Sequence, residues 1–127
     1  KPTNRYFNYI YVRMGAHTLI HKRTEDDIWK NLFELPLVET EKDLSEEEFL
    51  ACPQFHALFA EGEVRMVRTL LRGVKHVLSH RVIYTNFYEV TLPDNSSSFS
   101  SYQRVAVEDL GRYAVPRLIH AFLEKYV

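Results

Sequence analysis

The sequence predicts an α+β fold, in which a layer of strands is flanked by helices. Strand-like patterns open the chain, a helix signal follows at Ser45, strand patterns return after residue 63, and an amphipathic stretch closes the chain. This order differs from the regular alternation of strands and helices that is typical of a doubly wound sheet. With 127 residues and a hydrophobic content of 46%, we expect one compact domain.

The first forty residues predict three extended segments. Residues 6–14 (YFNYIYVRM) place large apolar side chains in a strand-like pattern, and Gly15-Ala16 supplies a turn into residues 18–22, so we expect an opening hairpin. A third extended run covers residues 32–41. Its Pro36 must lie at a bulge, at a strand edge or at a break between two short strands, because proline has no N–H to donate.

A helix is predicted to begin near Ser45. The sequence Ser45-Glu46-Glu47-Glu48 matches a capping box, in which the serine accepts from the backbone of Glu48 while that carboxylate returns to the serine N–H. Pro53 is expected to interrupt the helix, and residues 54–60 to form another short turn.

The second half predicts more strands and then a final helix. Residues 64–71, 74–80 and 81–92 have β-rich patterns, with Gly73 as a break and a connecting loop at Leu78-Ser79-His80. The polar run 93–101 is expected to be a mobile turn and residues 102–107 a last short strand. After Pro116, apolar side chains recur at helical spacing, at Leu118, Ile119, Phe122, Leu123 and Tyr126.

Composition excludes several classes of protein. Cys52 is the only cysteine, so the chain alone builds no intrachain disulfide, zinc knuckle or four-thiolate iron–sulfur cluster. We expect Cys52 to pack in the core within a reducing compartment. No run of eighteen apolar residues occurs and no apolar signal segment opens the chain, which predicts a soluble, cytoplasmic protein without a membrane partner.

Histidine and serine patterns do not predict a catalytic centre. The pairs His17/His21 and His76/His80 have a spacing that converges on a metal only in a helix, and both lie in β-patterned stretches. Ser79 precedes His80, but adjacent side chains in an extended segment point to opposite sides. We therefore predict neither a metal site nor catalytic residues in this chain.

Charge is unevenly distributed although the formal net charge is −1. The basic residues after residue 63 have two interpretations: an electropositive strip that binds a partner, or an ordinary solvated face. These residues are Arg65, Arg68, Arg72, Lys75 and Arg81. Carboxylates gather before them, at Glu39, Glu41, Asp43, Glu46, Glu47 and Glu48. A magnesium site for a pyrophosphohydrolase is one interpretation of these acids, but the capping box and the helix dipole already explain the last three.

The segment 54–59 (QFHALF) loosely resembles the glutamine-plus-aromatic peptides that dock into bacterial sliding clamps, which makes a clamp one candidate partner. Such a peptide must be exposed. The alternative is that Phe55, Leu58 and Phe59, at helical spacing, face the core.

Three blocks together resemble the C-terminal domain of MutY-type adenine DNA glycosylases. Residues 21–39 resemble the family's K-R-x-x-x-G-L-W-x-x-L-W-E-F-P run, residues 76–80 (HVLSH) its H-x-F-S-H loop, and residues 110–122 its closing block of Y-A-L-P type. Two departures are Leu78, where the family has phenylalanine, and Asp27-Ile28, where it has Gly-Leu before the tryptophan.

The resemblance implies a Nudix-like (MutT-like) fold with a mixed sheet and flanking helices. It implies that residues 1–127 are one C-terminal domain that recognises 8-oxoguanine paired with adenine in double-stranded DNA during base excision repair. The excision machinery and a 4Fe–4S cluster would then lie in a preceding helical domain, which would be a partner of this one. The Nudix signature has an Arg-Glu and a Glu-Glu pair on its helix, and residues 45–50 lack that arginine and the following glycine.

By this resemblance the lesion site is the loop at residues 78–80 with its neighbours. Ser79 would discriminate the base, because its hydroxyl accepts from the N7–H that distinguishes 8-oxoguanine from guanine. Leu78 would press against a base step, as an apolar wedge does. Four side chains would meet phosphates, namely Lys75, His76, His80 and Arg81. The alternatives are an active Nudix pyrophosphohydrolase and a protein-interaction module.

Overall fold

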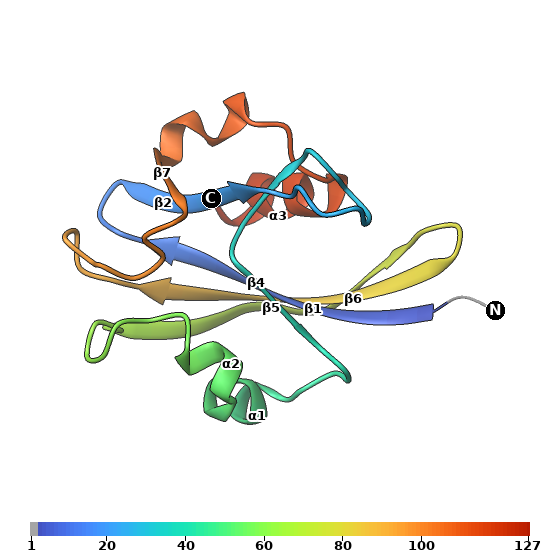
Figure 1. Cartoon of the computed structure of the whole chain (residues 1–127), viewed down its shortest axis with the longest axis horizontal. Helices are drawn as coiled ribbons and strands as arrows, with labels where there is room; N and C mark the ends of the chain where they lie inside the picture. Colours follow the sequence, from blue (N-terminus) through green and yellow to red (C-terminus); the bar gives the residue numbers. More distant parts are fainter. Residues whose placement is uncertain (1–2) are drawn as a thin grey trace.

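Two β-sheets and four helical segments lie in layers in the computed structural model, which describes residues 3–127 (Figure 1). The larger sheet has the order β4-β1-β6-β5, with strands β1 (Thr3–Arg13), β4 (Leu37–Thr40), β5 (Met66–Val77) and β6 (Arg81–Thr91). It is mixed, because β1 runs parallel to β6 while β4 and β5 run antiparallel to their neighbours. The smaller sheet is antiparallel and contains β3 (Phe33–Glu34), β2 (His17–Lys22) and β7 (Gln103–Ala106).

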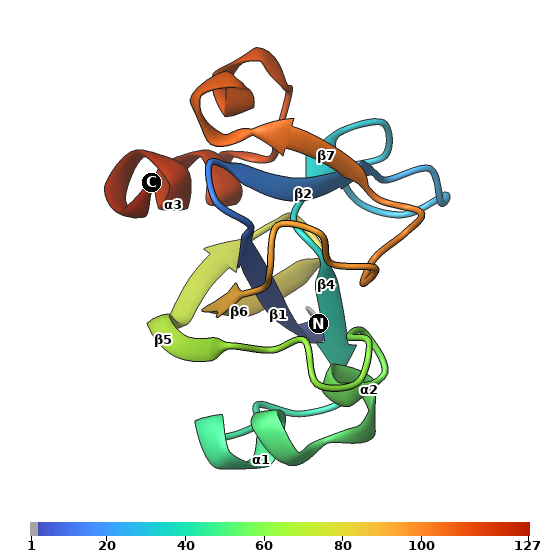
Figure 2. The same cartoon turned by 90° about the vertical axis from the view of Figure 1, so that its left-hand side faces the viewer.

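The helices cover opposite faces of the larger sheet (Figure 2). On one side lie the short helices α1 (Glu46–Ala51) and α2 (Pro53–His56). On the other side lie the smaller sheet, the 3₁₀ helix η1 (Val107–Arg112) and α3 (Arg117–Tyr126). This arrangement confirms the predicted α+β fold with a mixed sheet and flanking helices. None of the described helices is long and apolar enough to cross a membrane.

Strand alternation divides the buried side chains between two cores. The α3 core lies between the larger sheet and α3, and its buried members are Phe7, Tyr9, Tyr11, Ile20, Leu35, Ile83, Phe87, Val105, Leu110, Leu118, Ile119 and Phe122. The α1 core lies under α1 and α2, and its buried members are Ile10, Val12, Met14, Leu19, Val38, Phe49, Phe55, Tyr88, Val90, Leu92 and Phe99. Phe122 of α3 stacks on Phe87 of β6, with ring centroids 4.1 Å apart, which holds the last helix on the sheet.

The opening hairpin predicted from the sequence is wrong. Met14 and His17 form an isolated bridge around the turn at Gly15, but β1 and β2 then enter different sheets. The physical reason is that β1 is an inner strand. One edge pairs with β6 along the whole strand and the other pairs with β4 from Tyr6 to Tyr9, while β2 pairs with β3 and β7 in the smaller sheet.

The break predicted at Gly73 is also wrong. Residues 66–77 form a single strand, and Gly73 lies at an irregularity of its pairing with β6, with a φ of +70°. The Gly73 N–H donates to Oδ1 of Asn86 at 2.8 Å, so a side chain replaces the missing ladder bond. Glycine therefore permits a β-bulge here and does not end the strand.

Local predictions based on capping and on proline are confirmed. Pro36 lies between β3 and β4, which belong to different sheets, so it marks the break between two short strands. The capping box forms, with the Glu48 N–H donating to Ser45 Oγ at 3.1 Å and the Ser45 N–H donating to Glu48 Oε1 at 2.9 Å. Pro53 begins α2, and Pro116 is the N-cap of α3.

Candidate functional site

The candidate site is the turn that joins β5 to β6. The Leu78 N–H donates to the Arg81 carbonyl at 2.8 Å, directly after the last strand pair, Val77 with Val82. The His80 carbonyl accepts from the Thr3 N–H at 3.0 Å, so β1 ties the turn from its other side. Ser79 and His80 are exposed at the tip. The backbone of the turn is thus held while two polar side chains face solvent.

The six predicted site residues divide by exposure. Lys75, Ser79 and His80 are exposed, whereas three others are half-buried, namely His76, Leu78 and Arg81. Leu78 packs against the α3 core. His76 and Leu78 lie on the α3 side of the hairpin, and Lys75 lies on the opposite side, because side chains alternate along a strand.

Trp29 packs against the candidate site and was not among the residues predicted from the sequence. It belongs to the loop between β2 and β3, and its ring lies edge-on to His76, with centroids 6.0 Å apart, and to Phe7 at 5.9 Å. Trp29 has a φ of 59° and Asn31 a φ of 72°, both in the left-handed region that costs a non-glycine residue energy. The available signal was the position of this tryptophan in the first family-like block.

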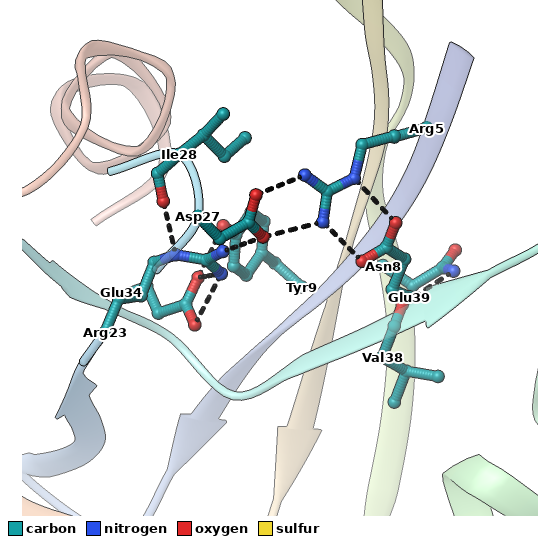
Figure 3. A network of polar contacts seen from close by, with 9 residues as sticks. All are labelled: Arg5, Asn8, Tyr9, Arg23, Asp27, Ile28, Glu34, Val38 and Glu39. Carbon is teal, nitrogen blue, oxygen red and sulfur yellow. Dashed lines mark hydrogen bonds and ion pairs between the residues drawn. The ribbon is translucent and has the colours of Figure 1, made fainter. Parts of the chain in front are cut away.

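A network of charged side chains fixes the loop that carries Trp29 (Figure 3). Arg5 Nη1 and Nη2 donate to the two Asp27 carboxylate oxygens at 2.8 and 2.9 Å, and Arg5 Nε donates to Glu39 at 2.8 Å. Arg23 Nη2 donates to the same Asp27 at 3.0 Å, and Arg23 Nε donates to the Ile28 carbonyl at 3.0 Å. The hydrogen bond from Arg5 lowers the pKa of Asp27 to about 2 although burial opposes this, so Asp27 stays ionised.

Glu34 is the buried carboxylate of this network, with 2% of its surface exposed. It accepts from Arg23 Nη1 at 3.1 Å and from the Tyr9 hydroxyl at 2.7 Å. Burial, followed by the charge of Glu34, raises the pKa of Tyr9. His21 Nε2 lies 2.9 Å from Glu34 Oε2, an ion-pair distance without hydrogen-bond geometry. Because its charge is compensated inside the fold, we interpret Glu34 as structural rather than catalytic.

The acidic stretch does not assemble a metal centre in the described part of the chain. Among residues 3–127 no group of three or more His, Cys, Asp or Glu side chains is placed to hold a metal ion. Glu48 is engaged in the capping box, while Glu46 and Glu47 lie exposed in the first turn of α1. Asp43 accepts from Asn86 at 3.2 Å and lies 3.8 Å from Arg72.

The predicted basic strip is largely engaged in contacts within the protein. Arg68 donates to Glu89 at 2.9 Å, and Arg65 donates to the Gly62 carbonyl at 2.6 Å. Arg72 donates to the Tyr88 hydroxyl at 2.7 Å and to the Leu44 carbonyl at 2.9 Å. Within residues 3–127, ion pairs engage neither Arg65, Lys75 nor Arg81. Arg81 is half-buried whereas Lys75 is exposed, so Lys75 is the more accessible of these two to an external anion.

The clamp-like segment is folded rather than extended. Phe55 is 4% exposed and contacts Phe49 and Phe59, with ring centroids 5.1 and 5.0 Å away. Leu58 and Phe59 pack against the α1 core. The core interpretation of these side chains is therefore confirmed.

Comparison with known proteins agrees with this architecture. A family model described as NUDIX domain matches residues 8–125, so the chain belongs to the NUDIX domain family. A search of curated proteins found no match.

Among solved structures, the C-terminal domain of mouse MUTYH, in complex with human PCNA, is similar with a TM-score of 0.68 and 14% identity, covering 96% of this chain and 86% of that one. A MutT protein from Methanosarcina mazei has a TM-score of 0.62 and 17% identity, with coverage of 98% and 94%. The Escherichia coli ORF135 protein has a TM-score of 0.61 and 14% identity, with coverage of 97% and 88%. At such identities these likenesses establish the fold alone.

Proposed function

We propose that this chain is the lesion-reading domain of a MutY-type adenine DNA glycosylase. In this function it recognises 8-oxoguanine in double-stranded DNA, while the full-length enzyme removes the adenine mispaired with it. The observation that carries the proposal is the turn at Ser79 and His80, which is exposed at its tip but held by backbone hydrogen bonds to Arg81 and Thr3. Further support comes from the three family-like sequence blocks and from the likeness to the mouse MUTYH domain.

The chemistry of the turn suits a damaged purine. 8-Oxoguanine carries a carbonyl at C8 and a proton on N7, whereas the N7 of guanine only accepts. The Ser79 hydroxyl can accept from that N7–H and can rotate to suit its partner. A rigid hairpin limits the rearrangement that reading the base requires. His80 adjoins Ser79, and Lys75 lies two residues before the end of β5. Both are exposed, so they are the candidates for contacts with phosphates, which position a protein without reading sequence.

We propose that residues 1–127 act as one recognition domain and that catalysis belongs to another part of the full-length enzyme. The 4Fe–4S cluster implied by the family resemblance has no fit in this chain, since Cys52 supplies one thiolate and such a cluster needs four ligands. The gene sequence upstream of Lys1 tests this proposal. It should encode a helical domain with four clustered cysteines.

An active pyrophosphohydrolase is the second candidate, favoured by the similarity to MutT proteins. The α1 segment does not fit the magnesium that this activity needs. It is six residues long, it lacks the arginine of the Nudix signature, and Glu48 is engaged in the capping box. Metal-stimulated release of diphosphate from 8-oxo-dGTP, above a heat-denatured control, would establish this second candidate.

A sliding clamp is a further candidate partner, since the similar mouse domain was solved in complex with human PCNA. In this chain residues 54–59 contribute Phe55 to the core, so a clamp would have to use another surface or unfold this segment.

The deciding experiment compares two duplexes that differ in one base. The domain is titrated with a fluorescent duplex containing 8-oxoguanine opposite adenine and with the same duplex containing guanine. We expect tighter binding to the lesion duplex, with affinity for both declining as salt rises. Equal affinity for the two duplexes would refute the reading function.

A further inference from the structure

The two faces of the β5–β6 hairpin differ at its free end. On the α3 side the loop between β2 and β3 covers the strands, because Trp29 contacts His76 and Leu78 joins the α3 core. On the opposite side α1 and α2 lie under the other half of the sheet, and no described element lies beneath the hairpin end in Figure 1. We call this uncovered surface the open face. Strand register places Thr40, the β4 partner of Tyr6, at its border, and assigns the rest of the face to Asn4, Tyr6, Lys75, Val77, Val82 and Tyr84.

The open face is a platform of two aromatic rings with a cation at its edge. Tyr6 and Tyr84 are register partners on β1 and β6, and their rings stack with centroids 5.6 Å apart and an interplanar angle of 17°. Lys75 is the register partner of Tyr84 on β5. Val77 is 66% exposed, and none of the six side chains belongs to the α1 core. The platform therefore remains uncovered within the described chain.

The charge and the hydrogen-bond donors of the open face indicate which kind of molecule binds there. Its six side chains include one cation and no carboxylate, and they offer an amide, two phenol hydroxyls and an ammonium as donors. These are groups that contact phosphate and sugar oxygens. Glu39 is bonded to Arg5 on the covered side, and Asp43, near the inner end, is held by Asn86 and Arg72. Glu41 follows β4 in an exposed turn beyond Thr40.

A stable protein partner fits the open face less well. A protein–protein interface of ordinary size engages about 20–30 residues a side around an apolar centre. The open face offers six side chains, of which two are aliphatic. A nucleic-acid backbone needs only a few cations and hydroxyls in the right positions.

We infer that double-stranded DNA lies across the open face, with a phosphate on Lys75 and the adjoining sugar–phosphate backbone over the rings of Tyr6 and Tyr84. DNA then reaches the Ser79 turn from the side of α1 and α2. His76 packs on Trp29 and supports the turn from behind. This inference rests on the proposed function, since it concerns the side from which the read DNA approaches.

The test compares two lysines near the turn that lie on different sides of it. Lys75 lies on the open face, whereas Lys30 is exposed in the loop that carries Trp29. Affinity for the 8-oxoguanine duplex is measured from 50 to 200 mM salt for the wild type, Lys75→Ala and Lys30→Ala. Loss of one phosphate contact reduces the slope of log K against log salt by about 0.9. The loss of affinity across this range should therefore be roughly 3.5-fold smaller for Lys75→Ala than for the wild type, and unchanged for Lys30→Ala.

Chemical acetylation of lysines in the wild-type protein is a second measurement, and it needs no variant. Bound DNA should slow acetylation of Lys75 and leave Lys30 unaffected, as measured by mass spectrometry. Tyr84→Ser should weaken binding at every salt concentration, and Tyr84→Phe, which keeps the ring but loses the hydroxyl donor, should recover part of it, with thermal unfolding as the check on folding.

The outcomes separate this inference from the proposed function. Protection of Lys30 in place of Lys75, or a reduced slope for Lys30→Ala alone, overturns the open-face assignment even if the lesion is read. Protection of Lys75 with equal affinity for the lesion and guanine duplexes supports the open face and refutes lesion reading. Absence of DNA binding by the wild type refutes both.

Discussion

Trp29 lies edge-on to His76, with ring centroids 6.0 Å apart and an interplanar angle of 63°. The contact joins the loop between β2 and β3 to the strand that ends at the β5–β6 turn. Trp29 also contacts Phe7 of β1, so one ring links three segments that are distant in the sequence. Trp29 therefore contacts, from outside the hairpin, the strand that leads into the Ser79 turn.

Replacing Trp29 should increase the mobility of the β5–β6 turn, although Trp29 lies outside the hairpin. Trp29→Ala removes both ring contacts of a half-buried side chain, so the free energy of unfolding should fall by about 2–3 kcal/mol, below the cost of a fully buried tryptophan. Hydrogen exchange at residues 77–80 should rise at the same time. Trp29→Phe is the matched control and should retain most protection. Unchanged exchange in the alanine variant would mean that the backbone hydrogen bonds of the turn, including the one from Thr3, hold it without Trp29.

Asp27 should make the fold sensitive to acid. Its pKa in the folded protein is about 2, below the ordinary value of 3.8, because Arg5 donates to it. Its contribution to stability is therefore fully present above about pH 4 and is lost as the pH falls towards 2. Urea unfolding of Asp27→Asn at a series of pH values should show a smaller decline over this interval than the wild type. Parallel curves would exclude Asp27 as the acid-sensitive group.

Breaking the buried pair of Arg23 and Glu34 should be costly. Glu34 is 2% exposed, and Arg23→Met leaves its buried carboxylate without the guanidinium partner. Such a change lowers the free energy of unfolding by about 3–5 kcal/mol. The double variant Arg23→Met, Glu34→Leu removes the stranded charge and should recover part of that loss. Chemical denaturation of the three proteins measures both effects. No recovery in the double variant would attribute the loss of stability to other contacts, namely those of Arg23 with Asp27 and the Ile28 carbonyl and that of the Tyr9 hydroxyl with Glu34.

Sequence reasoning found the elements that depend on local chemistry. The capping box at Ser45, the break at Pro36 and the final helix after Pro116 each follow from neighbouring residues. The same reasoning failed where the answer depends on distant partners. β2 separates from β1 and pairs with β3 and with β7, whose residues 103–106 are distant in the sequence.

The candidate site shows the same division. A polar turn at Ser79 was visible in the sequence, and its exposure follows from its place between two strands. The contact of Trp29 with His76 was not visible, because it requires a left-handed backbone at a tryptophan and a network through Arg5 and Asp27. The polar run 93–101 was predicted to be mobile. In the structure Ser96 and Ser98 donate to Glu63 at 2.6 and 2.7 Å, and Phe99 is buried.

The Glu63 carboxylate should therefore protect residues 93–101 from proteolytic cleavage. Its pKa is lowered to about 2, chiefly by the hydrogen bonds from Ser96 and Ser98, so the carboxylate stays charged at neutral pH and accepts from the loop. Glu63→Gln should weaken these contacts and speed proteolytic cleavage within residues 93–101. Glu61→Gln, a neighbouring exposed change, is the control. Equal cleavage of the two variants would show that Phe99 holds the loop without Glu63.

The last prediction concerns the Ser79 hydroxyl. Ser79 is exposed at the tip of the turn, so Ser79→Ala should leave the fold intact. In the proposed function this change removes one hydrogen bond to the lesion base, which contributes on the order of 0.5–1.5 kcal/mol. The preference for 8-oxoguanine over guanine opposite adenine should then fall by roughly threefold to tenfold.

Ser45→Ala provides the opposite pattern, because Ser45 caps α1 by accepting from the Glu48 N–H. It should reduce stability by about 1 kcal/mol and leave the lesion preference unchanged. Changing His80 together with Ser79 should cost more than Ser79→Ala, although the two effects need not add, because the residues are neighbours. Measuring both the unfolding free energy and the affinity for the two duplexes separates a base contact from a structural effect. An altered preference in Ser45→Ala with none in Ser79→Ala would mean that the β5–β6 turn does not read the base.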